Sequence, residues 1–147
     1  LKLASPQGRL VFAPAIPPNV HWIDVMASNG LGHNGYWYWL SKLDDIRVNN
    51  VSVIRCGSIL HPSCKFFVDT AGGGMVLAGL PKTTFPSMNP KCNALHDFPI
   101  VSVVIDSVSY DFKPEDYIFE NIEKQGECYT SILAAPSVTP FSVLGTT

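Results

Sequence analysis

The sequence predicts an all-β domain, and three observations lead to that prediction. Apolar and polar residues alternate over short runs, which is the periodicity of strands and not of helices. Turn residues, chiefly glycine, proline and asparagine, separate those runs. Hydrophobic residues make up 46% of the chain and charged residues only 15%, which favours a buried core over disorder. A sandwich or a barrel is the architecture that such strands build.

Length and charge restrict the class further. A chain of 147 residues is expected to form a single domain over 1–147. Its formal net charge of -2 provides neither a basic surface for nucleic acid nor a polybasic patch for a membrane. No apolar run approaches the ~20 residues of a membrane-spanning helix, and the first residues lack the layout of a signal peptide. We therefore expect no nucleic-acid partner and no membrane-spanning segment, with any targeting segment outside this chain.

The first half of the chain is predicted to contain strands joined by loops and one tight turn. Val20–Met26 alternates like a strand, and Tyr36–Leu40 has the aromatic density that favours one. Asn49 and Asn50 predict a hairpin turn, because asparagine tolerates the positive φ angles that such turns need. Val51–Cys56 is then the returning strand.

One tract combines an apolar run with polar and small residues. Lys65–Val68 is predicted to be a strand, and Asp69 and Thr70 follow it directly. Ala71–Gly74 cannot fill a core and predicts a flexible loop. A strand that delivers a carboxylate to a loop is one way to build a reactive site, although Asp and Gly also end ordinary strands.

The second half continues the strand pattern. Pro81–Pro99 is interrupted by prolines and predicts irregular structure. Asp106 and Ser107 predict a second turn, and Lys113–Ile118 a single helical turn with Pro114 at its first position. The runs predicted to be strands are Met75–Ala78, Ile100–Ile105, Val108–Phe112, Tyr129–Leu133 and Phe141–Leu144.

Aromatic, charged and histidine side chains are assigned structural or surface positions. Aromatic strand residues usually pack in a core or in cross-strand pairs, which we predict for Trp22, Trp37 and Trp39. A solvated strand face is predicted for Lys42, Asp44, Asp45 and Arg47. The histidines have no metal-ligand spacing and are predicted to be surface or structural residues: His21, His33, His61 and His96. No metal or cofactor is expected.

The four cysteines predict two disulfides. No close Cys-x-x-Cys pair and no histidine at zinc-finger spacing accompanies Cys56, Cys64, Cys92 and Cys128. Disulfides imply an oxidising compartment. Three pairings are possible by counting, and the short loop between the first two cysteines favours a local bridge. Asn50-Val51-Ser52 is a glycosylation acceptor pattern, which agrees with a secretory route although such triplets are common.

Six features, in the same order along the chain, resemble the C-terminal lobe of a pepsin-like aspartic protease. They are Tyr36–Leu40 with Ile46–Asn49, the small loop from Cys56 to Cys64, the strand Phe67-Val68-Asp69-Thr70, the hairpin Ile105–Phe112 with Pro114–Ile118, the bracketing Cys92 and Cys128, and Val143-Leu144-Gly145. Together they cover most of Gly8 to Gly145. The resemblance implies one lobe of a bilobal fold, with the family's closing hairpin beyond the end of this chain.

The resemblance also implies the site and its partners. It pairs Cys56 with Cys64 and Cys92 with Cys128, and it makes Val143-Leu144-Gly145 complete a ψ-shaped loop. Asp69 would be one of two catalytic aspartates, with Thr70 beneath it bonding across to the other lobe. The two carboxylates share a proton and activate a water that attacks the peptide carbonyl. The implied partners are an N-terminal lobe and a peptide or protein substrate, in an extracellular or acidic vesicular compartment of the secretory pathway.

The loop after Thr70 departs from the family pattern. The family has glycine at the position of Ala71 and Ser, Thr or Ala at that of Gly72, whereas Gly73 and Gly74 add freedom to a loop that should be rigid. The sequence contains no second Asp-Thr-Gly, so the isolated chain is predicted to be inactive. Two alternatives to a peptidase lobe are an inactive pepsin-like module that binds a protein and a homodimer that pairs two Asp69 residues.

Overall fold

The structure is a computed structural model that describes residues 18–26, 39–58, 64–85, 87–136 and 141–146. The described residues form eleven strands and little helix, so the all-β prediction is confirmed. One short helix is α1 (Pro114–Tyr117), and 3-10 turns cover Lys82–Thr84 and Cys92–Asp97. The strands are β1 (Leu40–Leu43), β2 (Asp45–Val48), β3 (Val51–Arg55), β4 (Cys64–Gly73), β5 (Met75–Ala78), β6 (Val101–Ile105), β7 (Val108–Phe112), β8 (Ile118–Glu120), β9 (Cys128–Thr130), β10 (Ile132–Ala135) and β11 (Ser142–Thr146).

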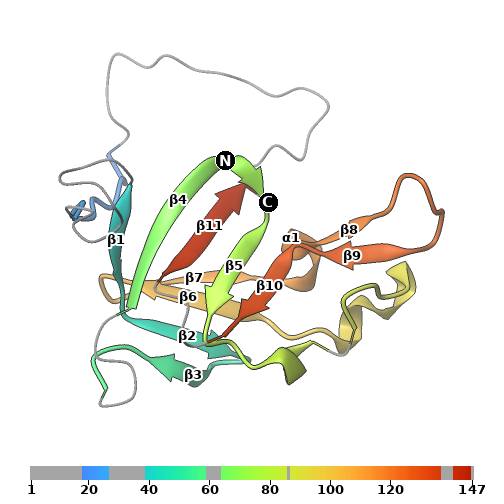
Figure 1. The fold of residues 1–147 in the computed structure, drawn as a ribbon, viewed down its shortest axis with the longest axis horizontal. Helices are drawn as coiled ribbons and strands as arrows, with labels where there is room; N and C mark the ends of the chain where they lie inside the picture. Colours follow the sequence, from blue (N-terminus) through green and yellow to red (C-terminus); the bar gives the residue numbers. More distant parts are fainter. Residues whose placement is uncertain (1–17, 27–38, 59–63, 86, 137–140, 147) are drawn as a thin grey trace.

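The larger sheet has five strands in the order β1-β4-β11-β5-β10. Figure 1 shows β11, from the end of the chain, lying between β4 and β5, which are consecutive in sequence. β11 runs parallel to β4 and antiparallel to β5. A strand inserted between two successive strands is the ψ-shaped arrangement that the sequence resemblance implied at Val143-Leu144-Gly145.

The second sheet has four antiparallel strands in the order β3-β2-β6-β7. Its strands run crosswise at the base of the larger sheet, and the β8–β9 hairpin projects to one side (Figure 1). Both hairpins of this sheet turn on two residues with positive φ, Asn49 (48°) and Asn50 (65°), and Asp106 (49°) and Ser107 (65°). Turns of this kind match the twist of the flanking strands, and both were predicted from the sequence.

The core is built around β6 and the two sheets. Every residue of β6 is buried, and Ile46, Phe66 and Ile132 pack in the same cluster. Tyr117 is fully buried beside them, and its hydroxyl donates to the Pro99 carbonyl over 2.6 Å. Burial, and then the negative charge of Glu115, raise the pKa of Tyr117. Tyr117 therefore has a structural role in the core.

Two disulfides connect elements that carry the site and the core. Cys56 is bonded to Cys64, which ties the end of β3 to the start of β4. Cys92 is bonded to Cys128, which ties a 3-10 turn to β9 across 36 residues of chain. The pairing implied by the resemblance is confirmed.

The strand predicted over Val20–Met26 is wrong. Residues 20–26 have no regular structure, although the Met26 N–H donates to the Leu40 carbonyl over 2.7 Å and the Ser41 hydroxyl donates to the Asp24 carbonyl over 2.6 Å. Alternation describes a segment with one apolar side, but a strand also needs a ladder of backbone bonds. In the described part of Tyr36–Leu40, the strand begins only at Leu40, and residues 36–38 lie outside the described chain.

Two further boundaries differ from the prediction. β4 continues through Ala71 to Gly73, where a flexible loop was predicted; β11 pairs with it at Asp69 and, after a register shift, again at Gly73 opposite Thr146. The strand predicted over Tyr129–Leu133 is divided at Ser131, since β9 pairs with β8 while β10 joins the larger sheet. In both places a distant strand decides where a local element ends.

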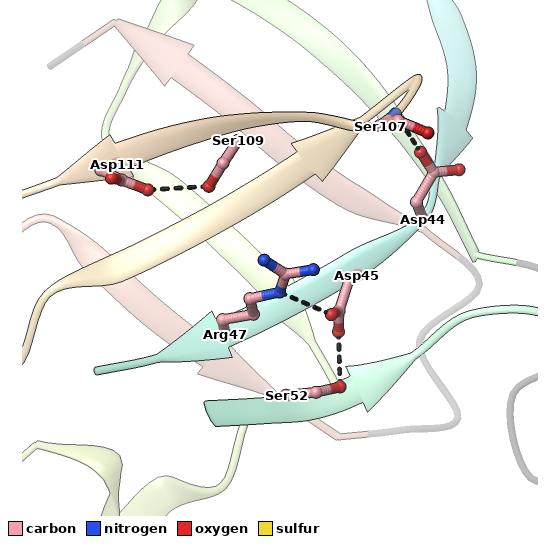
Figure 2. A network of polar contacts seen from close by, with 7 residues as sticks. All are labelled: Asp44, Asp45, Arg47, Ser52, Ser107, Ser109 and Asp111. Carbon is pink, nitrogen blue, oxygen red and sulfur yellow. Dashed lines mark hydrogen bonds and ion pairs between the residues drawn. The ribbon is translucent and has the colours of Figure 1, made fainter. Parts of the chain in front are cut away.

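The burial predictions for the tryptophans and for one aspartate are also wrong. Trp22 and Trp39 are 69% and 70% exposed, and Trp37 lies outside the described residues. Asp45 is only 8% exposed. Figure 2 shows the reason, because the Asp45 carboxylate accepts hydrogen bonds from Arg47 Nε at 2.8 Å and Ser52 Oγ at 2.7 Å. A buried carboxylate needs such partners.

The histidines within the described residues have the predicted surface positions. His21 contacts Asp106 at 3.2 Å, and His96 contacts Asp97 at 3.2 Å, both between exposed or half-exposed side chains. His33 and His61 lie outside the described residues. Exposed pairs of this kind contribute little to stability.

Candidate active site

Asp69 lies on β4 where that strand leaves the core. The first part of β4 is anchored by Phe66, which is 1% exposed and packs among the core residues. Three residues later Asp69 is half-buried, and Thr70 and Ala71 are exposed. The strand therefore delivers a carboxylate from a rigid base to the molecular surface, as a catalytic acid requires.

The backbone of β4 helps to hold the Asp69 carboxylate. The Ala71 N–H donates to Asp69 Oδ1 over 3.0 Å. Ala71, where the family pattern has glycine, therefore still supplies a backbone donor to the acid.

Gly72 provides the space for the other carboxylate oxygen. A Cβ atom at Gly72 would lie 2.7 Å from Asp69 Oδ2 and 3.2 Å from its carboxyl carbon. Real side chains do not approach this closely, so the carboxylate occupies the volume that a side chain at 72 would fill. Gly72, where the family pattern has Ser, Thr or Ala, therefore has a steric role toward Asp69. At Gly73, by contrast, an added Cβ would meet no atom within 4 Å.

Gly145 sits directly across from Asp69 on the inserted strand β11. A Cβ there would lie 2.6 Å from the Gly72 carbonyl oxygen and closer still to that of Gly74. The backbones of β11 and of the β4–β5 connection therefore touch, and only glycine allows it. The sequence pointed to Gly145 through the family resemblance, but not to the contact itself.

Exposed apolar side chains adjoin Asp69 along β4, although Val68, its neighbour in the strand, points to the opposite face of the sheet. The Val68 N–H donates to the Trp39 carbonyl over 3.2 Å, which places β4 next to the residue preceding β1. Val68 is 41% exposed and Trp39 is 70% exposed. Exposed large apolar residues that adjoin one another mark surfaces that bind other proteins.

The polar network in Figure 2 lies on the other sheet and is structural. The Ser107 N–H donates to Asp44 Oδ2 over 2.8 Å, which links the β6–β7 turn to the residue between β1 and β2. The pKa of Asp111 is lowered by the hydroxyl of Ser102, directly opposite on β6, and by that of Ser109. Only the Ser109 bond, at 2.8 Å, has hydrogen-bonding geometry, and Ser102 Oγ is otherwise buried without a partner among the described residues.

A separate pocket lies elsewhere on the molecule. Its volume is about 610 Å³, and it lies between residues 22–26 and β1, lined by Ile23, Lys42 and Asp106 among others. Asp69 does not line it. Within the described ranges, no group of three or more His, Cys, Asp or Glu residues could hold a metal ion.

These features define a class of protein: a β lobe whose ψ-shaped strand arrangement presents one aspartate at its surface. A family model described as eukaryotic aspartyl protease matches residues 15–147. The chain therefore belongs to the eukaryotic aspartyl protease family, as its resemblance to pepsin-like proteases implied. A comparison with curated proteins finds no match. None of the helices within the described residues is long and apolar enough to cross a membrane.

Proposed function

We propose that this chain is the C-terminal lobe of a pepsin-like aspartic endopeptidase and contributes Asp69 as one of two catalytic aspartates. The observation that carries the proposal is the position of Asp69, on β4 opposite Gly145 of the inserted strand, with its carboxylate accepting the Ala71 N–H. An N-terminal lobe, on the same or a separate chain, supplies the second aspartate, and Thr70 bonds across to that lobe.

The chemistry follows from the proximity of two carboxylates. Two adjacent negative charges are costly, so the pair holds one proton between its two acids. The ionised acid activates a water for attack on the peptide carbonyl, while the protonated acid polarises that carbonyl. Such a reaction needs no cofactor, and the isolated lobe would be inactive.

The surface around Asp69 supports pairing with a second lobe. Trp39 and Val68 expose apolar area beside the site, and burying it would stabilise the complex by about 25 cal/mol per Å². The substrate, a peptide or protein, would lie between the lobes. Two disulfides suit an oxidising compartment, so we place the protein in the secretory pathway, either extracellular or in an acidic vesicle.

One observation favours a second candidate function, an inactive pepsin-like module that binds a protein. Asp69 Oδ2 occupies the space above Gly72, so the carboxylate leans along its own strand, and no side chain at 72 can donate to it. Exposed Ala71 and Gly73 complete a surface with little electrostatic preorganisation. A module of this kind would keep the lobe and its surface while losing hydrolysis.

The experiment that tests the first function measures cleavage of an acid-denatured protein by the two-lobed protein over about pH 3 to 7, which includes the acidic range in which such a pair holds one proton. Cleavage that a pepstatin-type inhibitor blocks and that Asp69→Asn abolishes is expected. Asp111→Asn is the matched control, because Asp111 is an exposed aspartate on the other sheet. Absence of inhibitor-sensitive cleavage throughout that range would reject the peptidase.

The binding module has its own readout in the same preparation. If cleavage is absent, partners bound by the wild type are compared with those bound by Asp69→Asn and Trp39→Ala. Binding that survives the first change and is lost with the second would assign the exposed apolar surface to recognition. A mass of two chains in solution, lost on Trp39→Ala, would instead favour the homodimer that pairs two Asp69 residues.

A further inference from the structure

We propose that Asn50 carries an N-linked glycan, which goes beyond the proposed peptidase function and does not depend on it. Asn50-Val51-Ser52 is an acceptor triplet, and no other Asn-x-Ser or Asn-x-Thr triplet occurs in the sequence. The triplet alone is a weak indication. Its surroundings in the fold provide three independent observations, which concern the turn, the neighbouring asparagine and the serine.

The first observation is the location of Asn50. It is the second residue of the β2–β3 turn, with φ 65°, and it is exposed. A glycan is bulky and polar, so its attachment point must project into solvent without displacing packed side chains. The tip of a two-residue hairpin turn meets that requirement.

The second observation is that the two adjacent asparagines have different roles. The Asn49 carboxamide oxygen accepts the Ile100 N–H over 2.9 Å, and the Asn49 N–H donates to the Ile100 carbonyl over 2.9 Å. Asn49 therefore fastens the turn to the chain that enters β6. The Asn50 side chain makes no hydrogen bond to any residue in the described ranges, so its amide nitrogen is free to react with a diphospholipid-linked oligosaccharide. The bond between the amide nitrogen and the anomeric carbon forms as the bond from that carbon to the diphosphate breaks; the lipid diphosphate leaves and the amide loses one proton.

The third observation concerns Ser52. Its hydroxyl donates to Asp45 Oδ1 over 2.7 Å, next to the Arg47–Asp45 contact (Figure 2). Because Asp45 is 8% exposed, this hydroxyl also satisfies a buried carboxylate in the folded chain. Ser52 thus belongs both to the acceptor triplet and to the polar network, whereas Asn50 belongs to the triplet alone.

A glycan at this position would protect an open sheet edge. β3 is the edge strand of the four-stranded sheet, and Val51 beside Asn50 is 65% exposed. Exposed edges with apolar side chains invite pairing with another chain, and natural proteins cover or charge them. We therefore expect the unglycosylated protein to aggregate more readily than the glycosylated form.

The test uses the protein secreted from eukaryotic cells, treated with peptide-N-glycosidase in heavy-oxygen water and digested for mass spectrometry. The peptide that contains Asn50 is expected to carry a glycan and, after treatment, a heavy-oxygen aspartate at position 50. Recovery of that peptide only in unmodified form would overturn the proposal.

Substitutions in and beside the triplet distinguish the loss of the acceptor pattern from the loss of the turn structure. Asn50→Gln and Ser52→Ala should abolish the glycan, whereas Ser52→Thr should retain it. Asn50→Gly is the second loss variant, because glycine adopts positive φ without strain and so preserves the turn. Asn49→Gln is the control that keeps the triplet and loses only the contact to Ile100. A glycan that persists on this hairpin in both Asn50 variants would also contradict the proposal.

Discussion

The central strand of the four-stranded sheet and the site-bearing strand of the five-stranded sheet bury their residues in opposite ways. All five residues of β6 are buried, whereas β4 is buried at Phe66 and is exposed or half-exposed from Phe67 to Gly73. Within β6, both faces find partners inside this chain. The second half of β4 is paired through its backbone but has an uncovered face. The difference shows that one lobe can complete its core without covering its functional edge.

The largest effect is expected at the centre of the covered region. Tyr117→Ala removes a fully buried ring, and we expect the free energy of unfolding to fall by about 3 to 5 kcal/mol. Val68→Ala, in the uncovered half of β4, should cost less than about 1 kcal/mol, since this side chain is 41% exposed. Urea denaturation of both variants measures the difference. Similar losses would show that β4 is not the less buried region.

The same tyrosine makes a pH-dependent contribution. Because burial raises its pKa above the unfolded value, Tyr117 contributes stability that is complete below about pH 10 and is lost as the pH rises toward the folded pKa. Tyr117→Phe should cost about 1 kcal/mol through the lost bond to Pro99 and should remove this alkaline loss. Thermal melts of both proteins from neutral to alkaline pH test it, and an unchanged slope in the phenylalanine variant would contradict the assignment.

The two disulfides sharpen the comparison, because one joins the end of β3 to the start of β4, whereas the other ties a 3-10 turn to β9 beside the buried core. Replacing both Cys92 and Cys128 by serine opens a loop with a sequence separation of 36, and a chain-entropy estimate gives a loss of about 4 kcal/mol. Replacing Cys56 and Cys64, with a separation of 8, should cost about 2.5 kcal/mol. Denaturation midpoints of the two double variants provide the measurement. A larger loss from the shorter loop would indicate that the link at the start of β4 matters more than its length suggests.

Glycine variants test the ψ-shaped arrangement at Asp69. Gly145→Ala pushes a Cβ into the carbonyls of Gly72 and Gly74, and we expect a loss of about 1 to 3 kcal/mol or more from overpacking. Gly73→Ala meets open space and is the matched control, with a change of less than about 0.5 kcal/mol. Calorimetric melting of the two proteins distinguishes them. Equal stability would mean that β11 does not lie as close to the connection as the structure has it.

Gly72→Ala should affect the acid more than the fold. The Cβ would meet Asp69 Oδ2, a movable side-chain atom, so stability should change by less than about 1 kcal/mol. The carboxylate, however, must rotate, which weakens its bond from the Ala71 N–H. NMR shifts of the Asp69 carboxyl carbon and the Ala71 amide measure this rotation, with Gly73→Ala again as control. Unchanged shifts would contradict the steric role of Gly72.

The smallest effect is expected at Asp111, on the exposed strand β7. Its lowered pKa means that it contributes stability above the unfolded value of about 4, which is lost as the pH falls through the lower folded pKa. Asp111→Asn should therefore remove a small stabilisation near neutral pH and make the protein less sensitive to acid below about pH 4. Acid titration followed by circular dichroism compares the two. An unaltered acid transition in the variant would show that Asp111 does not contribute to the acid sensitivity of the fold.

The parts of the fold that could be predicted depend on local chemistry. The turns at Asn49 and Asn50 and at Asp106 and Ser107 follow from residues that tolerate positive φ. β5, β6 and β7 follow from short apolar or alternating runs. The family resemblance supplied the disulfide pairing and the ψ-shaped loop, which residue patterns left open. The single helical turn after Lys113 follows from Pro114 at its first position.

The predictions that the structure contradicts have a common cause. Residues 20–26 alternate but find too few backbone partners, Trp22 and Trp39 are aromatic but uncovered, and Asp45 is charged but buried by Arg47 and Ser52. Each outcome depends on residues distant in the fold or on surfaces outside this chain, which periodicity does not encode. At the candidate site, Asp69 could be predicted from its motif, whereas the steric role of Gly72 could not.

By itself, the sequence determined the all-β class, the turn positions, the even set of cysteines and the candidate acid, because these properties depend on side-chain type and short-range spacing. Only the tertiary structure decided that β11 inserts between β4 and β5, that β4 stays extended through Gly73, and that Gly145 touches the connection beside Asp69. Those features require two segments about seventy residues apart to share one ladder of hydrogen bonds. Backbone pairing and close packing between distant segments determine this arrangement, and local preference does not.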